Sequence, residues 1–332
     1  MNQVRELFRS PEWFPLTINF QRRVINFIHL EPDSYNEYLF LSLQAVQRRG
    51  GDIRDVRVDD ALFAAATSPS KKGPVHYILH TAYCCSTLLA RYFDLIPNCI
   101  VLKEPELLAQ VALAQSDSRE WRDVFDLSVR LLTRTYTKQE RVVIKAHVPC
   151  NTLAHSLLED NEKATIIFLL PQLRSFLLAV LKSMDRCNRV RSWNRHISRL
   201  AIARSELVHL DPDSLTDGES AAYWWFANRH ICEQLLAGPY ASRITVIDAD
   251  LIPNSPRETL DTVIRTCETQ FDEQKRNSLL NDPMVQQYSK DLSRPYDAEM
   301  RRRELADLER CWGNEADKVM QWLAHQKLSS EL

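Results

Sequence analysis

The sequence predicts a three-layer α/β fold, with a doubly wound, mainly parallel sheet of about five strands and extra helices at both ends. Five short apolar runs rich in Val and Ile recur between residues 75 and 249, and helical patterns separate them. Runs of this length that are apolar throughout are typical of strands buried on both faces of a parallel sheet. Their alternation with helices implies right-handed crossovers and helices on both faces of an open sheet.

The five predicted strands follow one another through the middle of the chain. They span residues 75–80, 99–105, 141–147, 164–170 and 243–249. Helical patterns lie between them, for example directly after the first strand and before the third. Ligands of open parallel sheets bind at the carboxyl ends of the strands, so we expect a functional site where these runs end.

Helical layers are expected on either side of this core. Residues 1–70 mix aromatic, aliphatic and charged positions at irregular helical spacing, and they predict an N-terminal helical layer. A stretch rich in Ser, Pro and Gly then leads into the α/β core, residues 71–265. Residues 266–332 are expected to form a C-terminal helical segment packed on the core, with two helices between about 298 and 326 that break near Gly313.

The composition limits the classes of function. The chain carries 42 basic and 44 acidic side chains, so its net charge of −2 gives no support for a nucleic-acid partner. Its longest apolar runs are less than half of the ~18 residues that a membrane span needs, and its first residues show no secretory signal. We therefore expect a cytoplasmic protein. The eight cysteines form no C-x-x-C pair, so no metal site is expected, and the oligomeric state stays open.

The turn after the first predicted strand is one candidate site. Residues 81–85 lead directly into a helix that begins with Ser86 and Thr87. A strand, a tight turn and a helix N-terminus present backbone N–H groups and hydroxyls to a phosphate, although the same two residues also suit simple N-capping. The glycine-rich Walker pattern of ordinary P-loop enzymes is absent. With only 6 glycines in 332 residues, a phosphate-binding turn here must work without them.

The third predicted strand ends with a candidate catalytic pair. Lys145 and His147 are two residues apart, and alternate residues of a strand share one face. A neutral imidazole can take a proton from an incoming hydroxyl, and an ammonium can neutralise charge on a transferred anionic group. A histidine that is merely hydrogen-bonded to backbone is the alternative for His147.

Three stretches of the chain resemble the sulfotransferase family. YILHTAYCCSTLLARYFDLIPNCIVLKEP is similar to the family's phosphosulfate-binding turn and helix, VVIKAHVPCNTL to its K-T-H-L-P motif, and RITVIDADLIPNSPRETL to its strand ending in Y-E-D-L. They lie in the family's order across residues 75–260. The resemblance implies a P-loop NTPase-like sulfotransferase fold and a reaction that needs no metal. It also implies 3′-phosphoadenosine 5′-phosphosulfate as co-substrate and transfer of a sulfuryl group to a hydroxyl or amine of a small molecule or peptide.

The resemblance also implies roles for individual residues. His147 would be the general base, Lys145 a stabiliser of the transferring sulfuryl group, and Glu104 a residue on the acceptor side or behind this pair. The phosphosulfate would be held by the turn, namely by Tyr83, Cys84, Cys85, Ser86 and Thr87. The 3′-phosphate would be held by Arg174, Lys182 and Ser183, or by Ser289, Lys290 and Arg294.

Departures from the family pattern keep other functions open. Tyr83 stands where the family has a basic residue, so the turn carries no positive charge. Cys85 stands where the family has glycine, and its side chain limits how closely the backbone can approach the oxygen atoms of the donor. The family's arginine and serine for the 3′-phosphate fall on Pro171 and Ala179. A non-catalytic nucleotide- or anion-binding protein on the same fold is the main alternative. Another is a phosphoryl or acyl transfer with Cys84 or Cys85 as nucleophile.

A basic run follows at residues 182–199 and surrounds Trp193. Such a segment suits an anionic substrate. It suits the solvated face of a helix or a lid equally well, and we expect a surface helix or lid.

Overall fold

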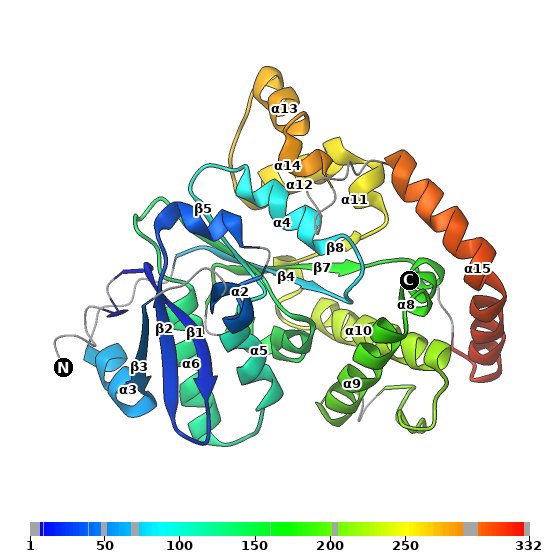
Figure 1. Cartoon of the computed structure of the whole chain (residues 1–332), viewed down its shortest axis with the longest axis horizontal. Coiled ribbons are helices and arrows are strands. Elements are labelled where there is room, and N and C mark those ends of the chain that lie inside the picture. Colours follow the sequence, from blue (N-terminus) through cyan, green and yellow to red (C-terminus); the bar gives the residue numbers. More distant parts are fainter. Residues whose placement is uncertain are drawn as a thin grey trace. The chain divides into compact units, whose positions relative to one another are not determined.

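Two sheets organise the chain (Figure 1). The computed structural model describes residues 7–8, 10–38, 40–47, 52–67, 73–159, 161–200, 205–287 and 298–328. The strands of the larger sheet are β4 (Val75–His80), β5 (Cys99–Lys103), β6 (Arg141–Lys145), β7 (Ala164–Leu170) and β8 (Ile244–Asp248). Their order is β5-β6-β4-β7-β8, and β6 pairs in parallel with both β4 and β5. The predicted fold class, an α/β fold on a parallel sheet of about five strands, is confirmed.

Helices connect successive strands of this sheet, as a doubly wound arrangement requires. The helix α4 (Ser86–Asp94) follows β4, and the helices α5 (Glu106–Leu113) and α6 (Arg119–Leu132) follow β5. After β6 come η2 (Val148–Leu153) and α7 (Ala154–Glu159), and after β7 come α8 (Leu173–Leu181), α9 (Met184–Leu200), α10 (Asp217–Ala237) and η3 (Ala241–Arg243). After β8 come α11 (Leu251–Asn254), α12 (Pro256–Thr266), α13 (Glu273–Leu280), α14 (Pro283–Gln286) and α15 (Ala298–His325).

Two predicted strands end two residues earlier than their apolar runs. β5 ends at Lys103 because Glu104 leaves the strand with φ of 51°, and Pro105 has no N–H to continue a ladder. β6 ends at Lys145, so His147 lies beyond the assigned strand. Both candidate residues, Glu104 and His147, therefore lie just past the carboxyl end of a strand.

The N-terminal region is not the helical layer that the sequence predicts. It contains a second sheet, antiparallel, of β1 (Trp13–Asn19), β2 (Val24–His29) and β3 (Ile53–Arg57). The prediction was wrong because β-branched and aromatic residues dominate β1 and β2, and their spacing is that of a hairpin rather than of a helix. The region also contains the helical segments η1 (Pro32–Glu37), α2 (Leu43–Gln47) and α3 (Val58–Thr67). The domain boundaries at 70 and 265 stay predictions.

The helix α15 also differs from its prediction, because it runs unbroken through Gly313. A Cβ at this position would lie 2.7 Å from Glu309 Oε1. Glycine therefore makes room for the Glu309 side chain one turn earlier and does not end the helix.

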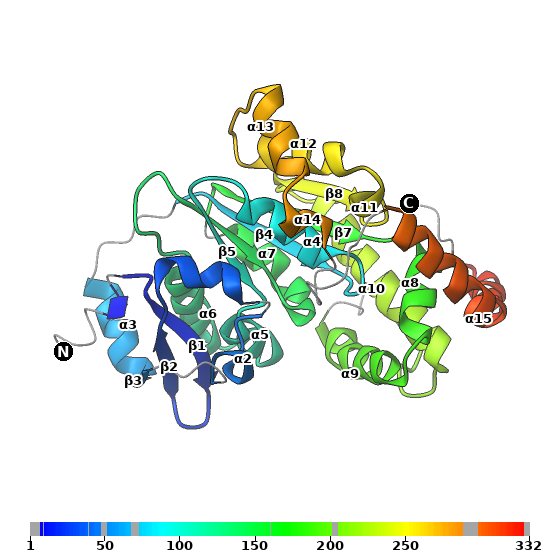
Figure 2. The same ribbon diagram turned by 45° about the horizontal axis from the view of Figure 1, so that its top comes forward.

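Contacts divide the chain into two compact units, each made of separated stretches. The first consists of Met1–Leu79, Ala90–Ile166 and Thr266–Thr269, and the second of His80–Leu89, Ile167–Arg265 and Gln270–Leu332. In the first unit, α5 and α6 pack against β1 and α3 packs against α6 (Figure 1). In the second, α10 packs against α8 and α9, and α15 lies along α8 (Figure 2).

The central helix of the second unit is α10. It begins with a capping box, in which Thr216 and Glu219 satisfy each other's backbone N–H groups, and it ends at Ala237, before Gly238. Residues around nearly its whole circumference are buried, which is typical of a core helix. Its two adjacent tryptophans, Trp224 and Trp225, are both buried to 1% exposure. Within the described ranges, no helix is long and apolar enough to cross a membrane.

Candidate functional site

The turn after β4 has a strained backbone. Ala82, Tyr83 and Cys85 have φ angles of 71°, 53° and 58°, in the left-handed region that residues with a Cβ rarely adopt. Each such residue costs roughly 1–2 kcal/mol. Turns that contain left-handed residues direct neighbouring N–H groups toward one point and form concave anion sites. The chain thus attains without glycine a backbone that such turns usually reach with it.

Side chains of the same unit hold this turn in place. The N–H of Ala82 donates to His80 Nδ1 at 3.0 Å, which places the proton of a neutral His80 on Nε2. The indole N–H of Trp224 donates to the Thr81 carbonyl at 2.8 Å. The two hydrogen bonds hold the N–H and the carbonyl of the same peptide group, the one that joins Thr81 to Ala82. The surrounding structure therefore holds the strained conformation in place.

Tyr83 anchors the turn on a row of tilted aromatic rings and contacts a cation. Its ring centroid lies 6.1 Å from that of Trp193, which in turn lies 5.4 Å from that of Trp224. The guanidinium carbon of Arg186 lies 4.4 Å from the Tyr83 ring centroid, within cation–π range. Burial raises the pKa of Tyr83, against the opposing charges of Arg186 and Arg189. A positive charge therefore lies against the turn, although no residue of the turn is basic.

Ser86 and Thr87 do not occupy the N-cap position. They are the first two residues of α4, and the carbonyl of Cys85 accepts from the Leu89 N–H at 3.1 Å. Cys85 is therefore the N-cap, the position from which a side chain caps a helix. The N-capping alternative does not account for these two residues, which are 6% and 5% exposed. Cys84 beside them is buried at 2% exposure.

In the first unit, Lys145 and Glu104 form a buried ion pair. Lys145 Nζ donates to Glu104 Oε1, and the two side chains are 1% and 18% exposed. The N–H of Glu104 also donates to the Lys145 carbonyl at 2.7 Å. Lys145 Nζ lies 5.4 Å from the ring centroid of Phe40. The left-handed backbone of Glu104 thus holds its carboxylate on Lys145 from the neighbouring strand.

His147 continues the extended backbone of β6. The N–H of Ala146 still donates to the Ile78 carbonyl of β4 at 3.1 Å, and the carbonyl of His147 accepts from the Cys150 N–H at 2.9 Å. His147 is half-buried, two residues after Lys145. Because Ile78 lies opposite Lys145 in a parallel pair, β4 and β6 end at the same edge of the sheet.

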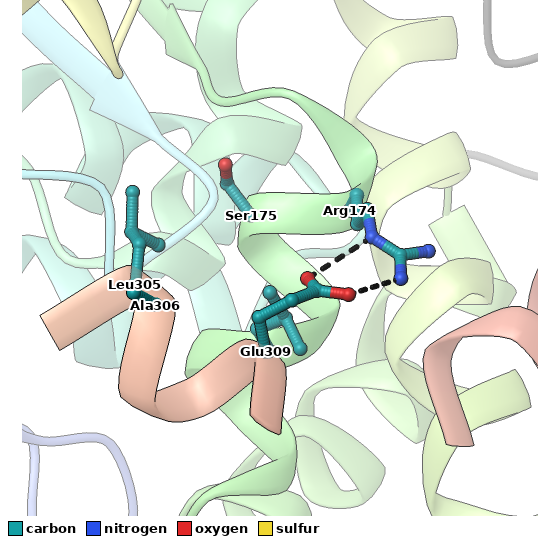
Figure 3. A pocket seen from close by; sticks show the side chains of 6 residues that line it. Arg174, Ser175, Leu305, Ala306 and Glu309 are labelled. Atoms are coloured by element: carbon teal, nitrogen blue, oxygen red, sulfur yellow. Dashed lines mark hydrogen bonds and ion pairs between the residues drawn. The ribbon is translucent and has the colours of Figure 1, made fainter. Parts of the chain in front are cut away.

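Arg174, the first candidate for a 3′-phosphate, is already neutralised. It forms ion pairs with Glu309 and with Asp317, the latter at 2.7 Å. These contacts raise the pKa of Arg174 through hydrogen bonds to both carboxylates. The Arg174–Glu309 pair lies at a cavity of about 310 Å³ between α8 and α15 (Figure 3). The cavity is lined by Arg174, Ser175, Leu178, Leu305, Ala306 and Glu309.

Lys182 lies in a different environment, which we call the Glu304 cluster (Lys182, Arg186, Arg301 and Glu304). Lys182 Nζ is 2.7 Å and Arg301 Nη1 3.5 Å from the Glu304 carboxylate. Burial raises the pKa of Glu304, but the hydrogen bond from Lys182 and the charges of Lys182, Arg301 and Arg186 lower it overall. Three cations thus act on this carboxylate, and Arg301 also pairs with a second carboxylate, that of Asp250, at 3.3 Å.

The remaining 3′-phosphate candidates divide in two groups. Ser183 directly precedes α9, and its carbonyl accepts from the N–H groups of Arg186 and Cys187 at 2.9 and 3.1 Å. Ser289, Lys290 and Arg294 lie outside the described residues.

The rest of the basic run forms surface ion pairs along α9. Arg189 pairs with Asp185 at 3.0 Å, Arg191 with Asp217 at 2.8 Å and Arg195 with Asp213 at 2.8 Å. Arg186 was not distinguishable from these residues in the sequence. Its distinguishing contact, with Tyr83, joins residues that only the fold brings together.

Comparisons with known proteins give the following neighbours. No protein-family model matches the sequence, and no curated protein matches it. Among solved structures, the chain is similar to the sulfotransferase domain from the Curacin biosynthetic pathway, with 14% identity over 66% of this chain and 78% of that chain and a TM-score of 0.39. It is similar to sulfotransferase STF9 from Mycobacterium avium, with 9% identity over 96% of both chains and a TM-score of 0.43. It is also similar to mouse sulfotransferase SULT7A1 complexed with PAP, with 11% identity over 66% of this chain and 68% of that chain and a TM-score of 0.36.

These neighbours belong to the class that the sequence motifs resemble. Their identities and TM-scores are low, so the function proposed for this chain rests on its own residues and geometry.

Proposed function

We propose that this protein is a cytoplasmic, sulfotransferase-like enzyme. It would transfer a sulfuryl group from 3′-phosphoadenosine 5′-phosphosulfate to a hydroxyl or amine of a small molecule or peptide. The observation that carries the proposal is the turn after β4, where three left-handed residues precede a helix that begins with two hydroxyls. An anion-binding role gives a reason both for the strain and for hydroxyls that do not serve as the N-cap.

The donor's phosphosulfate would be held by the turn. Its N–H groups and the N-terminus of α4 favour an anion, and Ser86 and Thr87 would donate hydrogen bonds to its oxygens. Arg186 would supply the positive charge that the turn itself lacks, since an arginine beside a phosphate forms charge-assisted hydrogen bonds. For the 3′-phosphate we favour Lys182 and Ser183 over Arg174, because two carboxylates would have to release Arg174 first.

The acceptor chemistry would lie with the residues after β6. His147 would take the proton from the acceptor hydroxyl or amine as that atom attacks the sulfur. Lys145 would neutralise the charge that grows on the oxygen from which the sulfuryl group departs. Glu104 would hold Lys145 Nζ in place until the anionic donor competes for it. The co-substrate supplies the sulfuryl group and leaves as adenosine 3′,5′-bisphosphate.

One observation favours a second candidate, a nucleotide- or anion-binding protein without turnover. Lys145 is buried and held by Glu104, and this pair also suits a purely structural ion pair at the end of the sheet. The two candidates predict the same nucleotide binding and differ only in turnover.

Calorimetry with two nucleotides tests the proposal. Adenosine 3′,5′-bisphosphate is expected to bind, and adenosine 5′-monophosphate, which lacks the 3′-phosphate, is expected to bind about tenfold more weakly or worse because it loses charge-assisted hydrogen bonds. The absence of measurable heat with the bisphosphate would contradict donor binding. Binding without transfer of labelled sulfuryl groups to any of a panel of phenols, alcohols and amines would favour the second candidate.

The role of Arg186 gives a separate prediction. Arg186→Met keeps most of the side-chain stem and removes the charge, so affinity for the bisphosphate is expected to fall about tenfold or more. The loss should shrink as salt concentration rises, because the lost interaction is electrostatic. Titrations at low and high salt measure both effects.

Two further variants control this experiment. Arg195→Met removes an exposed charge from the same helix and is expected to leave the affinity unchanged, whereas Arg186→Lys should restore part of it. Equal affinities of the Arg186→Met variant and the unaltered protein would remove Arg186 from the donor site.

A further inference from the structure

Two cysteines of the first unit lie in contact, and neither has a role in the function proposed above. Cys99 begins β5, and Cys267 directly follows α12. Their Sγ atoms are 3.6 Å apart although the residues are 168 positions apart in the sequence. A disulfide has an S–S length of about 2.0 Å, so the two sulfur atoms must approach by only about 1.6 Å to bond.

A neighbouring charge favours the reactive form of this pair. Arg141 of β6 lies opposite Cys99 in the parallel register. The hydrogen bond from the Cys99 thiol, assisted by the charge of Arg141, lowers the pKa of Cys267 against the effect of burial. The same hydrogen bond, together with burial, raises the pKa of Cys99. The lowered pKa favours the thiolate form at Cys267, and the thiolate is the nucleophile in sulfur chemistry.

Access to the pair is uneven. Cys267 is fully buried, whereas Cys99 is half-buried. Only the Cys99 side of the pair is exposed to solvent, so the oxidant chosen for the proposal is the small molecule hydrogen peroxide.

We propose that Cys99 and Cys267 are an oxidation site that closes to a reversible disulfide with hydrogen peroxide. The Cys267 thiolate attacks one peroxide oxygen, the O–O bond breaks, and the departing hydroxide takes a proton to become water. Cys267 is now a sulfenic acid. The Cys99 sulfur attacks it, the S–S bond forms, the S–O bond breaks, and a second water leaves with the Cys99 proton. The two thiols lose two electrons and the peroxide gains them.

The bond would attach a short, separate piece of chain to the sheet. Cys267 lies in the short stretch Thr266–Thr269. This stretch belongs to the first unit, whereas the chain on either side of it belongs to the second. β5 is an edge strand of the five-stranded sheet. Oxidation therefore ties this stretch covalently to the sheet edge and closes a loop of 168 positions, which restricts the unfolded chain.

The test uses the full chain with Cys311→Ser, because the exposed Cys311 would otherwise cross-link two copies. After hydrogen peroxide and then catalase, remaining thiols are alkylated under denaturing conditions and the digest is analysed by mass spectrometry. A peptide that joins Cys99 to Cys267, lighter than its two parts by two hydrogens and separated by dithiothreitol, is the expected result. The thermal unfolding midpoint of the oxidised protein should rise by about 5 °C or more over that of the reduced protein.

Single substitutions complete the test. Cys99→Ser and Cys267→Ser in the same background should each abolish both the joined peptide and the rise in midpoint. Circular dichroism shows whether each variant folds. If one of them does not fold, the other is compared with the background protein. If neither folds, the peptide map of the background protein, which keeps both cysteines, decides the question. A folded background protein that keeps all its thiols, or that joins other cysteines, overturns the proposal.

Discussion

His147→Ala is expected to lower the turnover of sulfuryl transfer at least about a hundredfold, the scale of a lost general base. The affinity for adenosine 3′,5′-bisphosphate should stay near that of the unaltered protein, because His147 acts on the acceptor rather than on the nucleotide. The side chain is half-buried at the end of β6, so its removal leaves no large cavity in the core. Turnover with labelled donor and calorimetry with the bisphosphate measure the two quantities separately.

His155→Ala is the matched control for this change. It removes an exposed histidine from α7, eight residues further along the same unit, and should leave turnover unaltered. If His147→Ala turned over at the original rate, His147 would have no part in the proton transfer.

Replacing both Ser86 and Thr87 by Ala is expected to weaken binding of the bisphosphate by roughly a hundredfold. A hydrogen bond to a charged group is worth about 1.5 kcal/mol or more, and two such losses multiply to about that factor. Stability should change little, because Cys85 rather than either residue is the N-cap of α4. Calorimetry gives the affinity, and thermal unfolding gives the stability.

A double exchange tests the hydroxyls apart from side-chain size. Ser86→Thr with Thr87→Ser keeps both hydroxyls and should retain most of the affinity. If the double alanine variant bound the bisphosphate as tightly as the original protein but unfolded at a lower temperature, Ser86 and Thr87 would have a purely structural role.

The sequence predicted the larger sheet well because its strands are short apolar runs with no competing pattern. β4 and β7 coincide with their predicted runs, and both are apolar or buried along most of their length. The small N-terminal sheet was missed because β3, with its sequence IRDVR, is mostly exposed and shows no apolar run. Without a recognisable third strand, the hairpin of β1 and β2 had no visible partner.

The candidate site could be predicted in part. The order of strand, turn, Ser and Thr was readable from adjacent residues, and so were Lys145 and His147. The left-handed turn was not, because its usual signal is glycine and the three residues involved are Ala, Tyr and Cys. Nor was the contact of Arg186 with Tyr83, since pairs this far apart in sequence meet only through the packing of α9 against the turn.

The clamps on the turn, from His80 on one side and Trp224 on the other, bear on the speed and selectivity of recognition. Because hydrogen bonds within its own unit already hold the turn in one conformation, binding of an anion would cost little conformational entropy. Encounter should then proceed in a single kinetic phase, as for a rigid receptor. If the turn binds an anion as proposed, its fixed shape should also favour tetrahedral anions over flat carboxylates.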